Sequence, residues 1–388
     1  MNKTKFFIKF ILKSLLKLLI GESHTQNIVY ALKVIFNRSL RKFFLSKQNL
    51  TKNLRVNEFS SPNHNVFFGY YDISPFGENS TLLATRVPKI NRTPEINDIM
   101  EIGYYDLNDN SNSFLKVAET QTWCWQQGCR LQWYDYAAGN ILYNSIKEGS
   151  YVSIIKSIYT KKVIEVYKKP IFSFSKNTNL GLSLNFSRLQ RLRPGYGYVN
   201  ITDNTEDSLI PENDGIWIVE MCTGKIKLLF SIFDIANYKP DDSMKGAQHY
   251  FNHIQFNPSG NRFLFFHLWQ KKNKRYRRLI TCDINGSDKF VLVDNGVVSH
   301  YNWKTDDELI IFSNTGINDS YMLYKDKTRV KKRIAPNLIS EDGHPSFSPN
   351  GKYLLTDTYP DKFGDQKLLL LNLDKDRLSQ LGSFYRPL

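Results

Sequence analysis

The sequence has few cysteines and lacks the short motifs that identify many enzyme classes. Its four cysteines, Cys124, Cys129, Cys222 and Cys282, form no CxxC pair and show no disulfide-framework spacing. We therefore expect reduced, mostly buried thiols in a cytoplasmic protein. The sequence also contains no glycine-rich phosphate loop, no GxSxG elbow and no HExxH motif, so function has to be inferred from other residues.

Acidic residues are scarce at the start of the chain. The net charge is +15, and residues 1–60 carry 12 Lys or Arg residues against only Glu22 and Glu58. This segment thus contributes +10, which leaves +5 for the other 328 residues. A nucleic-acid-binding fold would carry a basic stripe on its folded part, so we expect no nucleic-acid partner.

The basic segment has the pattern of an amphipathic helix. In residues 3–20 (KTKFFIKFILKSLLKLLI) lysine recurs every four residues, and residues 28–44 repeat the theme. Lysine interrupts the apolar run too often for a spanning helix, and no small-residue cleavage site of a secretory signal follows. We predict a basic helical arm over residues 1–58, with residues 3–45 on an anionic membrane surface. The alternative is that these helices pack on the rest of the chain or bind a partner.

Short strand patterns separated by turns replace the helical pattern from about residue 60 onward. The clearest repeats are residues 253–260 (HIQFNPSG), 300–307 (HYNWKTDD) and 344–351 (HPSFSPNG), each followed by an apolar run such as residues 263–266 (FLFF). Related turns begin at Ile73, Trp133 and Phe174, which makes six units. Because one four-stranded blade cannot bury both faces alone, the pattern predicts an all-β fold over residues 59–388, a β-propeller of six or seven four-stranded blades.

The longest spacing between turns separates the third unit from the fourth. It holds Arg188, Arg191 and Arg193, followed by a PGYGY turn that presents Tyr196 and Tyr198. Guanidinium groups pair with carboxylates, and aromatic rings stack on sugar faces, so this insertion suits an acidic sugar. The alternatives are a charged loop paired with nearby acidic residues, or a weak seventh blade. After the sixth unit the chain soon stops, so either residues 59–72 supply a closing strand or the natural chain is shortened.

Histidines occupy equivalent positions in three successive units. The residue three places before each turn is Tyr70, Arg130, Ile171, His253, His300 or His344. Equivalent positions on neighbouring propeller blades can converge, and three imidazoles would make a divalent-metal site at His253, His300 and His344. The alternative is that each histidine bonds to the backbone of a neighbouring blade. His249 and His267 lie out of register, and we expect them to be structural.

The three histidine segments resemble the propeller repeats of oligogalacturonate lyases and, more loosely, of TolB-like propellers. The resemblance covers roughly residues 60–380 and implies a seven-bladed propeller with a manganese-type ion, a histidine base and an arginine beside the cleaved bond. It makes His300 and His344 metal ligands and His253 the base. The family's glutamine ligand has no match, since Glu341, Asp342 and Gly343 precede His344.

Two functions fit these observations. The first is a carbohydrate-active propeller that binds or cleaves an acidic, uronate-containing polysaccharide by metal-assisted β-elimination, in the metabolism of bacterial surface polysaccharides. In that case His253 or a tyrosine of the 196–198 turn is the base, with Arg188, Arg191 or Arg193 near the carboxylate. The second is a non-enzymatic scaffold or carbohydrate-binding module for membrane-associated glycosyltransferases. Both functions place the protein in the cytoplasm at the inner face of the membrane.

Overall fold

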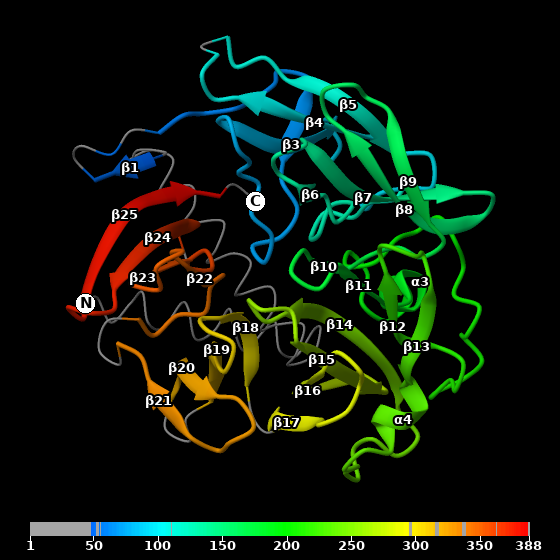
Figure 1. Cartoon of the computed structure of the whole chain (residues 1–388). Helices are drawn as coiled ribbons and strands as arrows, with labels where there is room; N and C mark the ends of the chain where they lie inside the picture. Colours follow the sequence, from blue (N-terminus) through cyan, green and yellow to red (C-terminus); the bar gives the residue numbers. More distant parts are fainter. Residues whose placement is uncertain are drawn as a thin grey trace, which may run out of the picture. The chain divides into compact units, whose positions relative to one another are not determined.

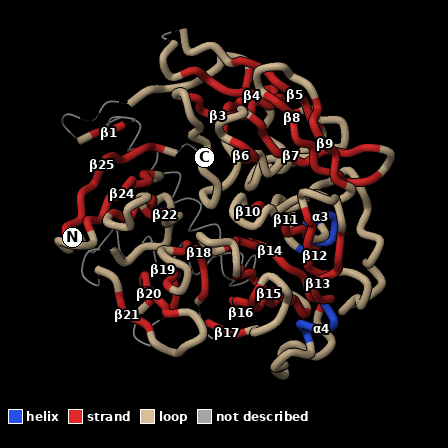
Figure 2. The backbone as a smooth tube through the Cα atoms, viewed as in Figure 1, coloured by secondary structure: helices blue, strands red, loops and turns tan. Residues whose placement is uncertain are grey.

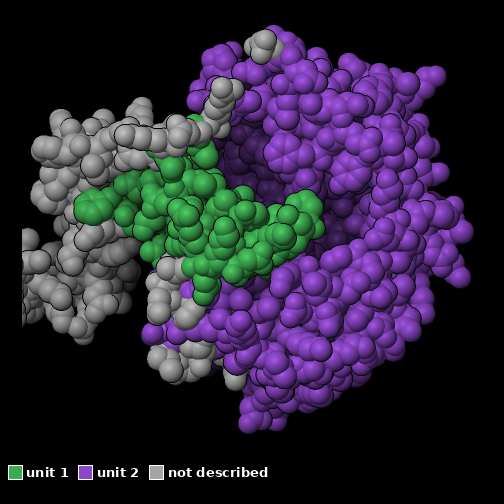
Figure 3. Space-filling view, turned by 60° about the vertical axis from the view of Figure 1, so that its left-hand side comes forward, with its two compact units in different colours: residues 1–55, 341–388 green, residues 56–340 purple. Residues whose placement is uncertain are grey.

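The structure is a computed structural model that describes residues 48–386, apart from residues 52, 53, 55, 110, 295, 296, 315–317, 336–338 and 362. The chain divides into two compact units. Unit 1 comprises Met1–Arg55 and Glu341–Leu388, and unit 2 comprises Val56–Ser340 (Figure 3). We describe each unit by itself.

The described part of unit 2 forms five antiparallel sheets of four strands. Their strands in chain order are β2 (His64–Phe67), β3 (Thr81–Pro88), β4 (Met100–Asp106) and β5 (Leu115–Thr120); β6 (Gln132–Asp135), β7 (Asn140–Lys147), β8 (Ser150–Ser157) and β9 (Val163–Tyr167); β10 (Ser173–Ser175), β11 (Leu180–Ser183), β12 (Gly215–Glu220) and β13 (Ile226–Ser231); β14 (Gln248–Phe256), β15 (Arg262–Lys271), β16 (Lys274–Asp283) and β17 (Phe290–Val293); and β18 (Val298–Trp303), β19 (Glu308–Asn314), β20 (Asp319–Lys325) and β21 (Lys331–Arg333) (Figure 1). Strands that pair within a sheet are also consecutive in the chain.

The first hairpin of every sheet turns where the sequence predicts it. In the fourth sheet, residues 257–261 connect β14 to β15, and the Gly260 N–H donates to the Asn257 carbonyl at 3.0 Å. Gly260 has φ +76°, and a Cβ here would lie 2.0 Å from Ser175 Oγ. This turn therefore requires glycine both for its backbone conformation and for its close contact with the preceding sheet.

The sheets of unit 2 are packed face to face, so their middle strands are buried on both sides. In β15 the first eight residues, Arg262 to Trp269, are all buried. Phe265 of β15 contacts Phe230 of the preceding sheet, with ring centroids 5.2 Å apart. Burying each such aromatic ring contributes about 1.5–3 kcal/mol to folding. A strand with one face in solvent would alternate apolar and polar residues. The consecutive apolar residues after the turns instead reflect strands that are buried between neighbouring blades on both faces.

The long insertion leaves its own sheet intact. Residues 184–214 leave β11 and return to β12, yet these two strands still pair up to the Ser183 and Trp217 positions. The insertion contains the helix α3 (Phe186–Leu192), whose N-cap Asn185 accepts a hydrogen bond from the Arg188 N–H at 2.9 Å. A second short helix, α4 (Ile232–Ala236), follows β13 (Figure 2). The described insertion contains no blade of its own.

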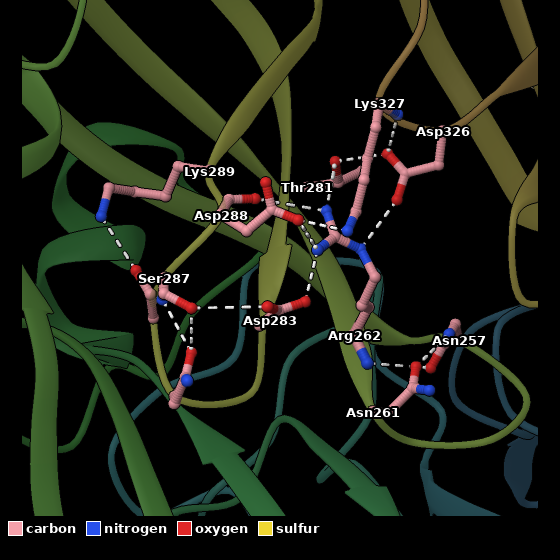
Figure 4. A network of polar contacts seen from close by, with 12 residues as sticks. Asn257, Asn261, Arg262, Thr281, Asp283, Ser287, Asp288, Lys289, Asp326 and Lys327 are labelled. Carbon is pink, nitrogen blue, oxygen red and sulfur yellow. Dashed lines mark hydrogen bonds and ion pairs between the residues drawn. The ribbon is translucent and has the colours of Figure 1, made fainter.

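A buried ion network joins the fourth and fifth sheets. Arg262, at the start of β15, donates from Nε to Asp326 at 2.8 Å and pairs with Asp283 and Asp288 (Figure 4). Asp326 follows β20 and also accepts from Thr281 at 2.6 Å. Because Arg262 and Asp326 are only 7% and 5% exposed, each charge depends on the other for compensation. The network therefore fixes the position of one blade against the next.

Unit 1 contains the sixth sheet. Its strands are β22 (Ser346–Phe347), β23 (Tyr353–Asp357), β24 (Asp365–Asn372) and β25 (Arg377–Tyr385), joined by a fifth strand, β1 (Gln48–Leu50). β1 pairs antiparallel with the outer strand β25. It covers an edge that would otherwise present unpaired backbone groups.

These observations confirm the all-β propeller fold in the described residues, with five sheets of four strands and a sixth that β1 extends to five. The expectation that residues 59–72 close the last sheet is wrong, because residues 64–67 form β2 of the first sheet and residues 48–50 pair with β25. The predicted helices within residues 3–45 lie outside the described residues. In the part of the chain that is described, neither helix has the length and apolar character needed to cross a membrane.

Candidate functional site

The first strands of two neighbouring blades are irregular where the site histidines occur. The register of β14 against β15 shifts between Asn252 and Gln255, and His253 has φ +51°. The pairing of β18 with β19 shifts in the stretch that contains His300. A bulge rotates a side chain away from the direction that strict alternation would give it. Local backbone strain of about 1–3 kcal/mol at such positions is characteristic of functional sites.

His253 and four other aromatic side chains, from different segments of unit 2, form a cluster of rings. We name Tyr70, Tyr71, Tyr196, His253 and His300 the ring cluster. Tyr70 stacks on His253 with centroids 5.1 Å apart, and Tyr196 meets His253 edge-on at 5.7 Å. His300 lies 6.4 Å from Tyr70 and 5.7 Å from Tyr71 between ring centroids. Equivalent positions on the first, fourth and fifth sheets therefore do converge, as the register of the turns predicts.

An arginine from the insertion adjoins the ring cluster. The guanidinium carbon of Arg193 lies 4.3 Å from the centroid of the Tyr196 ring. Burial opposes the charge on Arg193, but the phenol groups of Tyr196, Tyr250 and Tyr70 raise its pKa, so it stays protonated. Arg193, Tyr196 and His253 are all half-buried. The site thus combines a partly accessible imidazole, aromatic faces and a permanent positive charge.

Hydrogen bonds from a neighbouring blade hold His253 in place. The Tyr71 hydroxyl donates to the Tyr301 carbonyl at 2.9 Å and accepts from the Tyr301 N–H at 3.1 Å. The Tyr301 hydroxyl in turn donates to the His253 carbonyl. Burial raises the pKa of both phenols well above the usual value, so neither acts as a base. They position the backbone of the site.

The loop that carries Tyr70 and Tyr71 is fixed by an ion pair to the second sheet. Arg130, whose side chain is fully buried, donates from both terminal nitrogens to Asp72 at 3.1 and 2.8 Å. Its Nε donates to the Phe172 carbonyl at 2.7 Å. Such a two-point contact also fixes orientation. Asp72 and Arg130 are therefore positioning residues.

Two buried amide side chains adjoin the backbone of His253. Gln127 Nε2 donates to Asn252 Oδ1 at 3.2 Å, and this same oxygen accepts from the His253 N–H at 2.8 Å. Gln127 Oε1 and Asn252 Nδ2 are buried without a hydrogen-bond partner among the described residues. Gln127 lies shortly before the second turn of the sequence. The sequence pattern gives no signal for Asn252, because its contact with the His253 backbone occurs at a register shift of β14.

Arg188 and Arg191 lie in the interior of the insertion rather than at the ring cluster. Arg188 is 1% exposed and donates to the carbonyl oxygens of His249, Thr205, Ser208 and Leu209. Arg191 pairs with Asp203 at 2.9 Å and donates to Gln248. Nearly all donors of Arg188 are occupied, so it stabilises the insertion. The ion pair of Arg191 with Asp203 agrees with the alternative interpretation, although Arg191 lies in α3 rather than in a loop.

Tyr198 belongs to the core. It is fully buried and stacks on Phe186 with centroids 4.3 Å apart, and its hydroxyl accepts from Asn144 at 2.9 Å. Burial raises its pKa well above that of a free phenol, so it cannot serve as a base at neutral pH. Of the two tyrosines of the 196–198 turn, only Tyr196 contacts the ring cluster.

The three predicted metal ligands are divided between the two units, with His253 and His300 in unit 2. His344 belongs to unit 1, where its Nδ1 lies 2.9 Å from Asp357 Oδ1. Burial alone would raise the pKa of Asp357, but its hydrogen bonds and ion pair with His344 lower it. Across the described residues, no three His, Cys, Asp or Glu side chains are grouped so that they could hold a metal ion. The predicted site at His253, His300 and His344 therefore finds no support in the residues present.

The remaining sequence expectations concern buried groups. His249 and His267 are structural, with His249 Nδ1 2.8 Å from His267 Nε2 in the fourth sheet. The cysteines are free thiols, buried except for Cys222. Burial raises the pKa of Cys124 and Cys129 to about 12, so these thiols stay protonated.

The fold is similar to those of solved propellers. No protein-family model and no curated protein sequence matches the chain. Oligogalacturonate lyase in complex with manganese aligns with a TM-score of 0.58 and 12% identity, over 83% of this chain and 79% of the lyase. The oligogalacturonate lyase from Vibrio parahaemolyticus gives a TM-score of 0.56 and 9% identity, over 86% of this chain and 83% of that one. TolB from Acinetobacter baumannii gives a TM-score of 0.40 and 16% identity, over 76% of this chain and 64% of TolB. At these identities the similarity concerns the fold.

Proposed function

We propose that this propeller is carbohydrate-active and that its ring cluster, together with Arg193, binds and cleaves an acidic, uronate-containing polysaccharide. The observation that carries the proposal is the contact of a half-buried His253 with both Tyr70 and Tyr196, beside the Arg193 guanidinium. Aromatic rings offer apolar faces to a sugar, and a guanidinium pairs with a uronate carboxylate. The proposal also agrees in substrate class with the lyases that share the fold.

The chemistry that fits these residues is β-elimination. His253 removes the proton from C5 of the uronate, and the electron pair of the C5–H bond becomes the C4–C5 double bond. The bond from C4 to the glycosidic oxygen breaks, and the oxygen leaves with its electron pair and takes up a proton. Arg193 stabilises the negative charge that develops on the carboxylate as C5 loses its proton. The products are an unsaturated uronate and a shortened chain.

A divalent metal such as manganese remains a separate prediction for this chain. One lyase structure with the same fold is a manganese complex. The described residues of this chain offer no group of three ligands, so the mechanism above uses only His253 and Arg193. Metal analysis of the purified protein beside a His300→Ala, His344→Ala variant tests the prediction.

The decisive experiment follows the unsaturated product. Purified protein is incubated with oligogalacturonate and with glucuronate-containing oligosaccharides, and the absorbance of the unsaturated uronate is recorded. His253→Phe keeps an aromatic ring beside Tyr70 and removes the base, so we expect a rate about 10²–10⁴-fold lower. His64→Phe, a histidine that bonds to Ser61, is the matched control and should keep the full rate.

The outcomes separate the two functions. Product formation at equal rates in the wild type and His253→Phe contradicts the role of His253. Binding of these oligosaccharides without product identifies a carbohydrate-binding module or scaffold, the alternative function. If there is neither binding nor product, the proposal that the site takes an acidic saccharide is wrong.

We also propose a location. The lysine-rich residues 3–45 would hold the propeller at the inner face of a bacterial membrane, where surface polysaccharides are assembled. Glycosyltransferases at that membrane are the partners that this location suggests. The support is the sequence pattern of the arm.

A further inference from the structure

Unit 2 contains a cavity that the ring cluster does not use. It has a volume of about 350 Å³ and lies between the insertion and the second and third sheets. Lys168, Lys169, Asn185, Asp214 and Trp217 are among its lining residues. Ligand sites have volumes of about 300–1,000 Å³, so this cavity has room for a ligand the size of one sugar.

A lysine is held inside the cavity without a hydrogen bond. Lys169 Nζ lies 3.9 Å from the centroid of the Trp217 ring, which attracts the ammonium through its π face. Among the described residues the ammonium donates to no protein acceptor. Burial lowers the pKa of Lys169, and the charge of Asp214 opposes that shift. The lysine thus keeps its three donors for another group.

The indole of Trp217 presents a second donor. Its Nε1 atom is buried and makes no hydrogen bond with any described residue. A buried N–H without a partner is rare in folded proteins and calls for an explanation such as a bound ligand or water. Two unpaired donors on residues that line one cavity indicate an acceptor-rich ligand.

The cavity is also lined by a hydrogen-bond acceptor, the carboxylate of Asp214. Asp214 is 7% exposed and accepts from Asn185 Nδ2 and from the Gly215 N–H, both at 2.9 Å. A carboxylate can accept about four hydrogen bonds, so Asp214 has capacity for ligand hydroxyl donors. Burial raises the pKa of Asp214, and the hydrogen bonds from Asn185 and the Gly215 N–H oppose that shift.

We propose that this cavity binds one sugar acid, with its carboxylate at Lys168 and Lys169 and its hydroxyl groups at Asp214 and Trp217. Hydroxyl groups both donate and accept, which matches the mixture of acidic, amide and indole groups. Lys168 and Lys169 are the cations among the described lining residues, and the ammonium of a lysine pairs with a carboxylate. The site goes beyond the proposed function, because none of the residues that we assign to the ring cluster lines the cavity.

The test measures binding of D-glucuronate by calorimetry, with D-glucose, D-glucose 6-phosphate and glycine as comparison probes. We expect the wild type to bind glucuronate at least about 10-fold tighter than glucose, since a glucose molecule leaves the lysines unpaired. Lys169→Met keeps the aliphatic stem and removes the charge, and it should weaken glucuronate binding at least about 10-fold. Trp217→Phe keeps a ring and removes the N–H, and it should weaken binding by roughly threefold.

Two controls separate this site from the ring cluster and from general charge. Lys225→Met removes an exposed lysine from the turn after β12, and His253→Phe alters the ring cluster; neither should change glucuronate binding. Thermal unfolding of each variant shows that it is folded. The proposal is overturned if glucuronate does not bind, if Lys169→Met binds it as the wild type does, or if His253→Phe abolishes binding. Tighter binding of glucose, glucose 6-phosphate or glycine also overturns it.

Discussion

Three arginines within one short stretch of the insertion have three different surroundings. Arg188 is buried and bonds to backbone carbonyls, Arg191 pairs with Asp203, and Arg193 lies over the Tyr196 ring. Arg188 and Arg191 belong to α3, and Arg193 is the residue that ends it. Positions along and after a helical turn point in different directions. A cluster of equal residues in the sequence thus separates into two structural residues and one site residue.

Substitution of Arg188 should therefore lower stability, whereas substitution of Arg193 should lower ligand binding. Arg188→Met leaves several buried carbonyls without their donor, while Asp203 keeps its ion pair with Arg191. We therefore expect a loss of about 3–5 kcal/mol in the free energy of unfolding. Arg193→Met should leave stability nearly unchanged and reduce binding of oligogalacturonate by at least about 10-fold. Urea unfolding and binding assays on both variants check the contrast. If Arg193→Met binds like the wild type, Arg193 is not part of the site.

The sequence revealed some site residues and concealed others for physical reasons. Tyr70, His253 and His300 could be found because turns mark the register of each blade, and equivalent positions converge. Asn252 could not be found, because its contact with the His253 backbone occurs at a register shift that leaves no pattern in the sequence. Tyr198 was assigned to the site because a glycine-rich turn favours exposure, whereas tertiary packing buries this ring.

A chain of buried hydrogen bonds crosses β14, β15 and β16 and ends at Met244, which precedes β14. Arg278 Nε donates to His267 Nδ1 at 3.0 Å, and His249 Nε2 lies 3.1 Å from the Met244 carbonyl. Since a carbonyl only accepts, His249 carries its proton on Nε2, and its Nδ1 accepts from His267 Nε2–H. Both rings are therefore neutral, and the chain has no place for another proton. Burial, with the nearby Arg278 charge, keeps the pKa of His267 well below the usual value.

This arrangement makes the stability of the fold depend on pH. Burial lowers the pKa of His249 from 6.5 to about 4, so below about pH 6.5 the unfolded chain binds protons that the folded chain does not. The free energy of unfolding should thus fall as the pH decreases from 6.5 towards 4, by about 3 kcal/mol from His249 alone. Urea unfolding at a series of pH values measures this change in the free energy of unfolding.

Two matched variants isolate the contribution of His249 to the pH dependence of stability. His249→Phe should flatten the pH dependence between pH 6.5 and 4, whereas His64→Phe, at a partly exposed ring, should leave it close to that of the wild type. An identical pH profile for the wild type and His249→Phe would show that His249 is protonated in the folded protein.

The fold class follows from the sequence because each blade repeats the same local pattern. Six turns predicted six or seven blades, and the described chain has six sheets. Strand β1 could not be predicted, because residues 48–50 (QNL) carry no strand pattern. They form a strand through their pairing with the outer edge of β25. The interior of the insertion was equally hidden, since long-range contacts rather than periodicity determine it.

The N-terminal arm supplies a prediction for the whole chain. The full-length protein should sediment with vesicles that contain anionic lipid and not with neutral vesicles. Changing Lys5, Lys9, Lys13 and Lys17 to Gln should weaken this binding by roughly 100-fold or more, because each lysine contributes about 1 kcal/mol near an anionic surface. Raising the salt concentration should have the same effect. Equal sedimentation with neutral vesicles would instead indicate an apolar interaction.

The insertion between β11 and β12 also bears on how the protein can diversify. This single stretch supplies Tyr196 to the ring cluster, Arg193 beside it, and Asn185 and Asp214 to the cavity, while β11 and β12 remain paired. Exchange of that stretch between related genes would change the side chains at both proposed sites in one event and leave the strands of the blade unchanged.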